Sequence, residues 1–197
     1  LFAETPPLEA KRMLISRAAT RRKSDGVWRQ LLFIDARKAH LNPRCEEDVF
    51  IELPEECGYG PDVCGKLNFW LYGFRAAAAA WEKHYSTLLE DTGFIRGIGC
   101  GVVFWHKDRD IALAVHGDDF TFCGAREDLD WAAKVVSSWF EVKVRANLGP
   151  GANDDKTVTI LGRTVTWGDD GIHWEADARH RKKIIDYFGF TDNTRVL

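Results

Sequence analysis

The sequence lacks the features that mark membrane, collagen-like and nucleic-acid coat proteins. No apolar run approaches the roughly 20 residues of a membrane-spanning helix, and the most apolar stretch, Ala76 to Trp81, is short and mostly alanine. Basic residues number 27 against 30 acidic ones, so the net charge of −3 argues against a generally basic coat protein. With 45% hydrophobic residues in a chain of 197, neither a disordered tail nor a collagen fits, and a globular domain remains.

The cysteines are few and odd in number. The five of them form no Cys-x-x-Cys pair, which disfavours a zinc site and a disulfide framework and favours free thiols. The chain opens without a charged-then-apolar signal peptide. We therefore expect an intracellular protein, cytoplasmic or nuclear, that is neither secreted nor membrane-bound. The only methionine is Met13 and the chain begins at Leu1, so we expect a piece of a longer polypeptide.

Apolar periodicity indicates both helices and strands. Spacing of three and four predicts helices over residues 8–23, 75–89, 126–140 and 176–188. Short apolar or alternating runs predict strands over residues 31–34, 49–53, 101–105, 111–115, 120–123 and 141–144, and a hairpin over 157–167 and 171–174. This order predicts an α+β fold, with an antiparallel sheet and helices packed on one face.

Three Asp-Asp pairs are candidates for chemistry. Asp154-Asp155 lies in a loop rich in glycine, which favours a solvated position, and Asp169-Asp170 precedes Gly171, a hairpin-turn signal. Asp118-Asp119 differs, because it separates two apolar strands. Adjacent carboxylates at a buried hairpin need a counter-charge such as Mg²⁺, although an exposed turn explains the pair about equally well.

Asp35 adds to this picture because it ends the apolar strand at residues 31–34. An acid there and a distant acidic hairpin can assemble a carboxylate cluster that holds two metal ions for phosphoryl transfer. Taken alone, Asp35 is better explained as the N-cap of whatever follows it.

Several segments, in order and at matching spacing from about residue 4 to residue 190, carry a resemblance. The segment Ile34-Asp35-Ala-Arg-Lys-Ala39-His40-Leu41-Asn42 resembles Leu-Asp-Val-Lys-Thr-Ala-Phe-Leu-Asn, and His116-Gly-Asp-Asp119 stands where Tyr-Val-Asp-Asp is usual. The other matching segments are Glu4-Thr5-Pro6, Glu47 to Pro54, Val63-Cys64, Lys66-Leu67, Leu71-Tyr72-Gly73, Ala80-Trp81 and Leu161-Gly162. Together they resemble the reverse transcriptases of copia-type retrotransposons.

The resemblance implies one reverse-transcriptase-like domain over residues 1–197, a right-hand polymerase palm with part of the fingers and a C-terminal hairpin and helix. Asp35, Asp118 and Asp119 would bind two Mg²⁺ ions, with Mn²⁺ as a substitute. The implied activity is RNA-directed DNA synthesis in a polyprotein, and the implied partners are deoxynucleoside triphosphates and an RNA or DNA template with its primer. The residues implied to bind the nucleotide are Ala36, His40 and Arg75, and those implied to contact nucleic acid are His116, Gly117, Leu161 and Gly162.

Departures from the family pattern keep alternatives open. His40 replaces an aromatic plate that rejects ribose, Ala76 and Ala78 replace Gln and Pro, and the basic residues of the upstream fingers would precede Leu1. These changes favour a decayed palm that at most binds nucleic acid. A viral RNA-templated RNA polymerase also uses Gly-Asp-Asp hairpins, but the copia-like segments argue against it. The basic stretches Arg12 to Lys23 and Arg179 to Lys183 suit either phosphate contacts or a solvated helix face.

Overall fold

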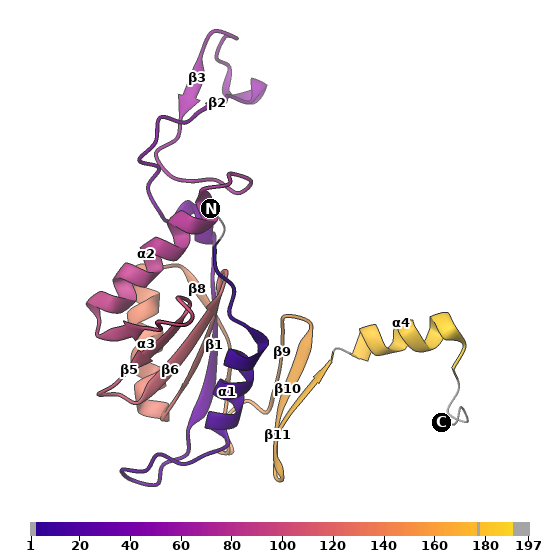
Figure 1. Ribbon diagram of the computed structural model, residues 1–197. Helices are drawn as coiled ribbons and strands as arrows, with labels where there is room; N and C mark the ends of the chain where they lie inside the picture. The colour runs from indigo at the N-terminus through magenta and orange to yellow at the C-terminus, as the bar shows by residue number, and fades with distance from the viewer. Residues whose placement is uncertain (1–2, 177, 191–197) are drawn as a thin grey trace.

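The computed structural model describes residues 3–176 and 178–190, which fold as an α+β protein with antiparallel sheets (Figure 1). The predicted fold class is confirmed at this level. The α-helices are α1 (Leu8–Ala18), α2 (Ala77–Asp91), α3 (Arg126–Trp139) and α4 (Ala178–Phe188). The strands are β1 (Gln30–Ala36), β2 (Phe50–Glu52), β3 (Cys64–Lys66), β4 (Phe94–Arg96), β5 (Val103–His106), β6 (Ile111–His116), β7 (Asp119–Gly124), β8 (Val142–Leu148), β9 (Thr157–Ile160), β10 (Arg163–Gly168) and β11 (Gly171–Ala176).

A six-stranded antiparallel sheet forms the body of the molecule, in the order β4-β5-β6-β7-β1-β8. The apolar run at residues 31–34 occupies β1, and all four of its residues are at most 2% exposed. A strand that is buried on both faces typically has a continuous apolar sequence, and the strand predicted from this run is confirmed. Because side chains alternate along β1, Leu31, Phe33 and Asp35 point to one face and Leu32, Ile34 and Ala36 to the other.

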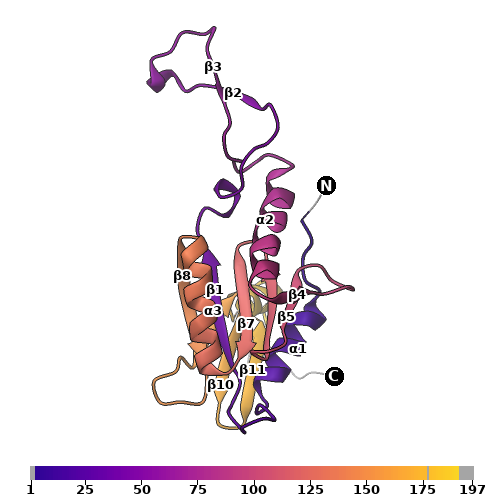
Figure 2. The ribbon, with the colours of Figure 1, turned by 90° about the vertical axis from the view of Figure 1, so that its left-hand side faces the viewer.

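The face that carries Leu32 and Ile34 packs against α2 and α3 (Figure 2). Trp81 of α2 lies in the centre of this core, 2% exposed, with its ring centroid 4.7 Å from that of Phe140 and 6.4 Å from that of Phe120. Aromatic side chains of this size contribute most of the apolar area that such a core buries.

The opposite face packs against α1 and a second, three-stranded sheet in the order β11-β10-β9. Leu14 and Ala18, four residues apart on α1, are fully buried here, over Ala112 and Ala114 of β6. The small side chains on the sheet allow the helix to approach closely. The expectation that the helices pack on one face is therefore wrong for α1, since periodicity reveals a buried helix face but not the side of the sheet it covers.

Two predicted elements are shorter than expected. The first helix stops at Ala18 rather than continuing to residue 23, and the strand expected over residues 157–167 breaks into β9 and β10. Leu161 and Gly162 form the break with φ angles of +49° and +69°, the paired positive values of a type I′ turn. The chain therefore makes three strands where the sequence predicted two.

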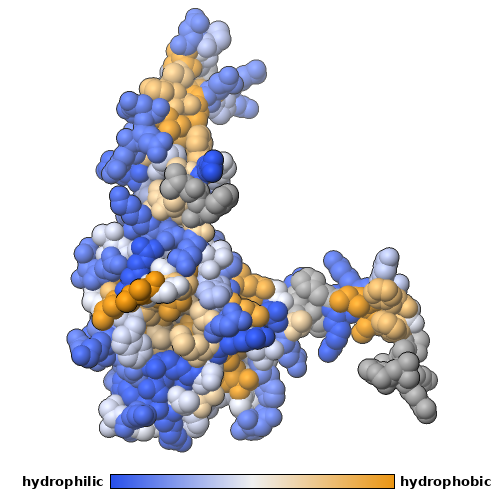
Figure 3. Space-filling view, in the orientation of Figure 1, coloured by the Kyte–Doolittle hydropathy of each residue, from blue (hydrophilic) through white to orange (hydrophobic). Residues whose placement is uncertain are grey.

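The segment around β2 and β3 leaves the body as a long arm, which the space-filling view shows with apolar surface along its length (Figure 3). Among its exposed apolar side chains are Phe50 at 57% and Tyr59 at 65%. Within the described residues, no helix is both long enough and apolar enough to cross a membrane.

Candidate active site

The register of the central strands brings two of the three candidate carboxylates together. In the β1–β7 pair, Asp35 lies directly opposite Asp119, so both side chains point to the face that carries α1. The third acid, Asp118, stands in the turn just before β7, and its carbonyl oxygen accepts a hydrogen bond of 2.9 Å from the backbone N–H of Ala36. Three acids from two distant segments thus meet at one end of the sheet.

The turn that holds the acidic pair is a two-residue hairpin loop. His116 pairs with Asp119 across it, leaving Gly117 and Asp118 as the loop. Gly117 has a φ of +63°, as the first position of a type II′ turn requires. Its carbonyl oxygen accepts a 2.9 Å hydrogen bond from Nε1 of Trp81, which ties the loop to the core.

We expect Gly117→Val, which restores the residue usual in the resembled family, to lower the free energy of unfolding by about 1–2 kcal/mol. A Cβ at Gly117 meets no atom within 4 Å, so the expected cause is backbone strain at positive φ. The measurement is urea denaturation. The matched control is Gly99→Val, because a Cβ at Gly99 also meets open space but its φ is not in the left-handed region. Equal losses at both positions would contradict the strain account.

Asp119 sits in an unfavourable setting for a charge. The residue is 7% exposed, and its Oδ1 atom is buried without a hydrogen-bond partner. Burial raises the pKa of this carboxyl, the nearby charges of Asp118 and Asp35 raise it further, and Arg145 and Lys11 act in the opposite direction. A buried acid beside two other acids is typical of a site that binds a cation.

The raised pKa of Asp119 predicts how stability varies with pH. The folded protein holds the Asp119 proton more tightly than the unfolded chain, so this group lowers the free energy of unfolding as pH rises above about 4. We expect Asp119→Asn to be more stable than the unaltered protein at pH 7, and the difference to shrink toward pH 4. Thermal melts across this range measure it, with the exposed Asp62→Asn as the control. An Asn variant that is less stable than the unaltered protein at pH 7, with a deficit that shrinks toward pH 4, would mean that Arg145 outweighs burial.

The cation that faces these acids is Arg145, a residue that the sequence did not single out. Its Nη2 forms an ion pair with Asp35 and lies 3.5 Å from Oδ1 of Asp119. The hydrogen bond to Asp35 raises the pKa of Arg145. In the β1–β8 pair the register shifts between Phe33 and Ile34, so Arg145 is the extra residue of a β-bulge. Bulges redirect side chains, and this one directs a guanidinium toward the acids.

The carboxylates have the chemistry of a Mg²⁺ site, since hard oxygen ligands suit that ion and Oδ1 of Asp119 has no hydrogen-bond partner. In this structure, however, Asp35 and Asp119 both face the guanidinium group of Arg145. Among residues 3–176 and 178–190, no group of three or more His, Cys, Asp or Glu side chains is placed to hold a metal ion. The acids therefore fit a divalent cation only if the guanidinium of Arg145 moves away.

Two of the residues expected to contact nucleic acid, His116 and Leu161, line one pocket of about 520 Å³ on the α1 face, beside the acids. Nζ of Lys11, from α1, lies 3.3 Å from Nδ1 of His116. Burial lowers the pKa of both groups. Leu161 is 44% exposed. Its backbone has a positive φ, which is energetically unfavourable for a residue with a branched side chain. Gly162 completes the turn beside it, and Gly117 lies in the acidic hairpin.

The residues expected to bind the nucleotide are spread more widely. Ala36 is 1% exposed and points into the core on the face opposite Asp35, so only its backbone contacts the acidic hairpin. The His40 ring lies 4.5 Å from the Tyr72 ring, centroid to centroid, and its Nδ1 is buried without a hydrogen-bond partner. Arg75 is exposed in the turn before α2.

The other two acidic pairs have structural roles. Asp169-Asp170 forms the turn between β10 and β11, as predicted, and Asp170 accepts a 2.8 Å hydrogen bond from His173. The expectation of a solvated Asp154 is wrong, because its side chain is 7% exposed and pairs with Arg126 at 2.8 Å. Asp154 also accepts from Gln30 and from the backbone of Gly151, and these three donors order the loop.

The comparisons with known proteins add nothing to what the geometry of the site shows. Neither the scan against protein-family models nor the search of curated proteins finds a match for this chain.

Proposed function

We propose that this chain is the palm of a copia-type RNA-directed DNA polymerase, which transfers a nucleotide to a primer 3′-hydroxyl. One observation carries the proposal. Asp35 and Asp119 lie opposite each other on neighbouring strands, with Asp118 in the adjoining turn. The alternative explanation of the acidic pair, that both residues lie in an exposed turn, does not account for the burial of Asp119, which is only 7% exposed. The β2–β3 arm corresponds to the partial fingers in this proposal.

The surroundings suit a reaction on a polyanion. Phosphoryl transfer depends on positioning and charge neutralisation more than on a covalent group. Divalent cations, when bound at the carboxylates, would supply that neutralisation. The chain itself supplies Lys11 and Arg163 beside His116, in the pocket that Leu161 borders. These cations would hold phosphate oxygens of the primer strand next to the acids.

A second candidate is a palm that binds nucleic acid without extending it. The ion pairs that Arg145 makes with Asp35 and Asp119 favour it, because a fixed guanidinium occupies the place that the cations of a polymerase would need. The alanines at positions 76 and 78 and the histidine at position 40 are further departures in this direction.

Primer extension on an RNA template with deoxynucleotides separates the two candidates. A polymerase extends the primer only when Mg²⁺ or Mn²⁺ is added, and Asp118→Asn removes the extension. A folded sample that binds the primer–template duplex but extends nothing supports the second candidate. A sample that neither binds nor extends contradicts both.

Replacing Arg145 tests whether its guanidinium competes with divalent cations. We expect Arg145→Gln to tighten Mn²⁺ binding roughly tenfold, because the carboxylates lose the positive charge that holds them. Isothermal titration calorimetry on the protein without nucleic acid measures this. Lys134→Gln is the control, since it removes the same charge from an exposed position of α3, which packs on the face of the sheet opposite the acids. Unchanged affinity in Arg145→Gln would show that Arg145 does not compete.

A further inference from the structure

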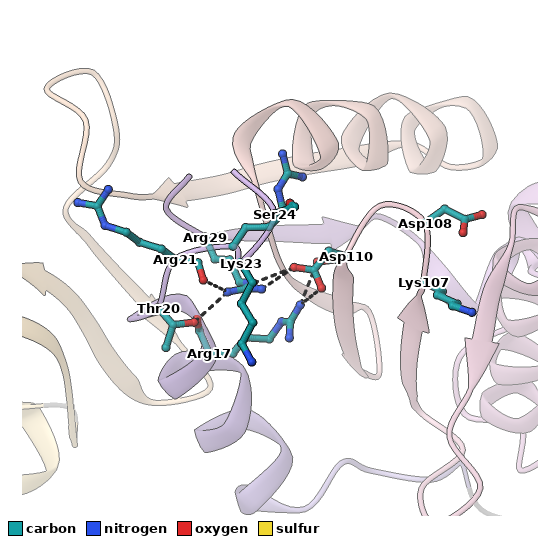
Figure 4. Close-up of a pocket in the computed structure, with 10 residues that line it drawn as sticks. Arg17, Thr20, Arg21, Lys23, Ser24, Arg29, Lys107, Asp108 and Asp110 are labelled. Carbon is teal, nitrogen blue, oxygen red and sulfur yellow. Dashed lines mark hydrogen bonds and ion pairs between the residues drawn. The ribbon is translucent and has the colours of Figure 1, made fainter. Parts of the chain in front are cut away.

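A concentration of positive charge lies at the other end of the sheet from the acids. There the end of α1, the loop over residues 19–29 and the β5–β6 turn enclose a pocket of about 720 Å³ (Figure 4). Asp108 and Asp110 are the acids in its lining. The cations in its lining are Arg17, Arg21, Arg22, Lys23, Arg29 and Lys107.

Three of these cations are already paired with acids. Arg17 and Arg29 share the single carboxylate of Asp110, at 2.5 Å and 2.6 Å, and Figure 4 shows the two guanidinium groups on either side of it. Arg22 pairs with Asp25, Glu127 and Asp128, which lie outside the lining. One carboxylate for two arginines leaves a positive charge, and Nε of Arg17 is a buried donor without an acceptor.

The remaining cations add to this excess. Arg21 donates to the carbonyl of Gly26 and lies over the ring of Trp28, so both of these partners are neutral. Lys23 is exposed and, within the described part of the chain, makes no ion pair with an acid. The carbonyl end of α1 also faces this region, but its partial charge amounts to only about half an elementary charge.

The loop that carries these cations is ordered by its own hydrogen bonds. The backbone N–H of Arg22 donates to Val27 at 2.7 Å, and that of Gly26 donates to Arg22 at 2.8 Å. Arg29, 8% exposed, donates to the Arg21 carbonyl and to the Thr20 hydroxyl. The space-filling view shows strongly hydrophilic surface at this end of the body (Figure 3). A fixed array of donors binds an anion with little loss of conformational entropy.

We propose that this pocket is a phosphate-binding site, distinct from the carboxylate site. Guanidinium and ammonium groups that line one pocket with excess positive charge are the donors that phosphate oxygens prefer. Arg29 immediately precedes β1, and Asp35 lies six positions further along the chain, roughly 20 Å at the rise of a strand. The phosphate belongs either to a nucleic-acid backbone or to free pyrophosphate. Only the choice of nucleic acid as a probe rests on the proposed function.

Fluorescence anisotropy tests the site with the unaltered protein and labelled single-stranded RNA of about 12 nucleotides. We expect Lys23→Glu to weaken RNA binding roughly tenfold. We also expect the slope of the logarithm of the binding constant against the logarithm of the salt concentration to fall in magnitude by about one, which corresponds to one fewer ion released on binding. The matched control is Lys134→Glu, an equal charge change on the exposed face of α3, with an effect of about twofold or less. Equal losses in both variants, or no binding by the unaltered protein of RNA or pyrophosphate, would overturn the proposal.

Competition identifies the source of the phosphate. Displacement of RNA by micromolar pyrophosphate, with loss of that effect in Lys23→Glu, assigns the pocket to free phosphates, and no displacement assigns it to the nucleic-acid backbone. The result is separate from polymerase activity. Weakened RNA binding by Lys23→Glu without any primer extension by the unaltered protein would refute polymerisation alone, whereas extension with no effect of Lys23→Glu would refute the phosphate site alone.

Discussion

Asp118→Asn is expected to lower Mg²⁺-dependent primer extension by about 10³-fold, equivalent to about 4 kcal/mol of transition-state stabilisation. The substitution keeps the size of the side chain and removes its negative charge. Asp118 is exposed in its turn, and its contact with β1 is made by the backbone carbonyl, so folding is expected to survive. Rates of single-nucleotide addition, measured beside a thermal melt of each sample, give the comparison.

The control for this variant is Asp169→Asn, which makes the same chemical change in the exposed turn between β10 and β11. Because that turn belongs to the three-stranded sheet and its acids form the hairpin turn, we expect the rate of primer extension to be unchanged. A comparable fall in both variants would mean that the assay responds to surface charge. Extension by Asp118→Asn at the rate of the unaltered protein would remove Asp118 from the proposed chemistry.

Trp81→Ala is expected to lower the free energy of unfolding by about 3–5 kcal/mol, which is enough to unfold a domain of marginal stability. Trp81 is 2% exposed and packs edge to face against Tyr85, Phe120 and Phe140. Its removal leaves a cavity beneath the acidic hairpin. Urea denaturation followed by circular dichroism measures the loss.

Trp81→Phe separates packing from the hydrogen bond to Gly117. Phenylalanine keeps an aromatic ring in the core but cannot donate to the Gly117 carbonyl, so one buried acceptor loses its partner at a cost of about 1–3 kcal/mol. We expect faster hydrogen exchange in the hairpin at residues 116–119. Trp139→Ala, at the partly buried edge of the same core, is the control and should cost less than Trp81→Ala. A larger loss at Trp139 would contradict the central role given to Trp81.

Local patterns in the sequence predicted most of the elements because they are local properties. The apolar run at residues 31–34 predicts a buried strand wherever it lies, and Asp169-Asp170 before Gly171 predicts a turn without reference to the rest of the chain. The failures have a different cause. The side of the sheet that α1 covers depends on the small residues Ala112 and Ala114, which are about 100 positions away in the sequence.

The candidate site shows the same division. The hairpin position of Asp118-Asp119 and the strand-end position of Asp35 follow from the sequence, and the structure brings Asp35 and Asp119 opposite each other. Arg145 carried no signal, because the predicted strand ended at Val144 and a β-bulge exists only in the pairing of two strands. The burial of the Asp154 side chain was not predicted for a similar reason, since its partners Gln30 and Arg126 come from distant elements.

By itself, then, the sequence determined the α+β class, the acidic hairpin and the resemblance that suggests a polymerase. Only the tertiary structure decided that a guanidinium faces the carboxylates and that six cations gather around two acids at the far end of the sheet. The physical reason is the range of the interactions. Apolar periodicity and turn chemistry act between neighbours in the chain, whereas ion pairs, burial and the pKa of Asp119 depend on which distant segments the strand register brings within a few ångströms.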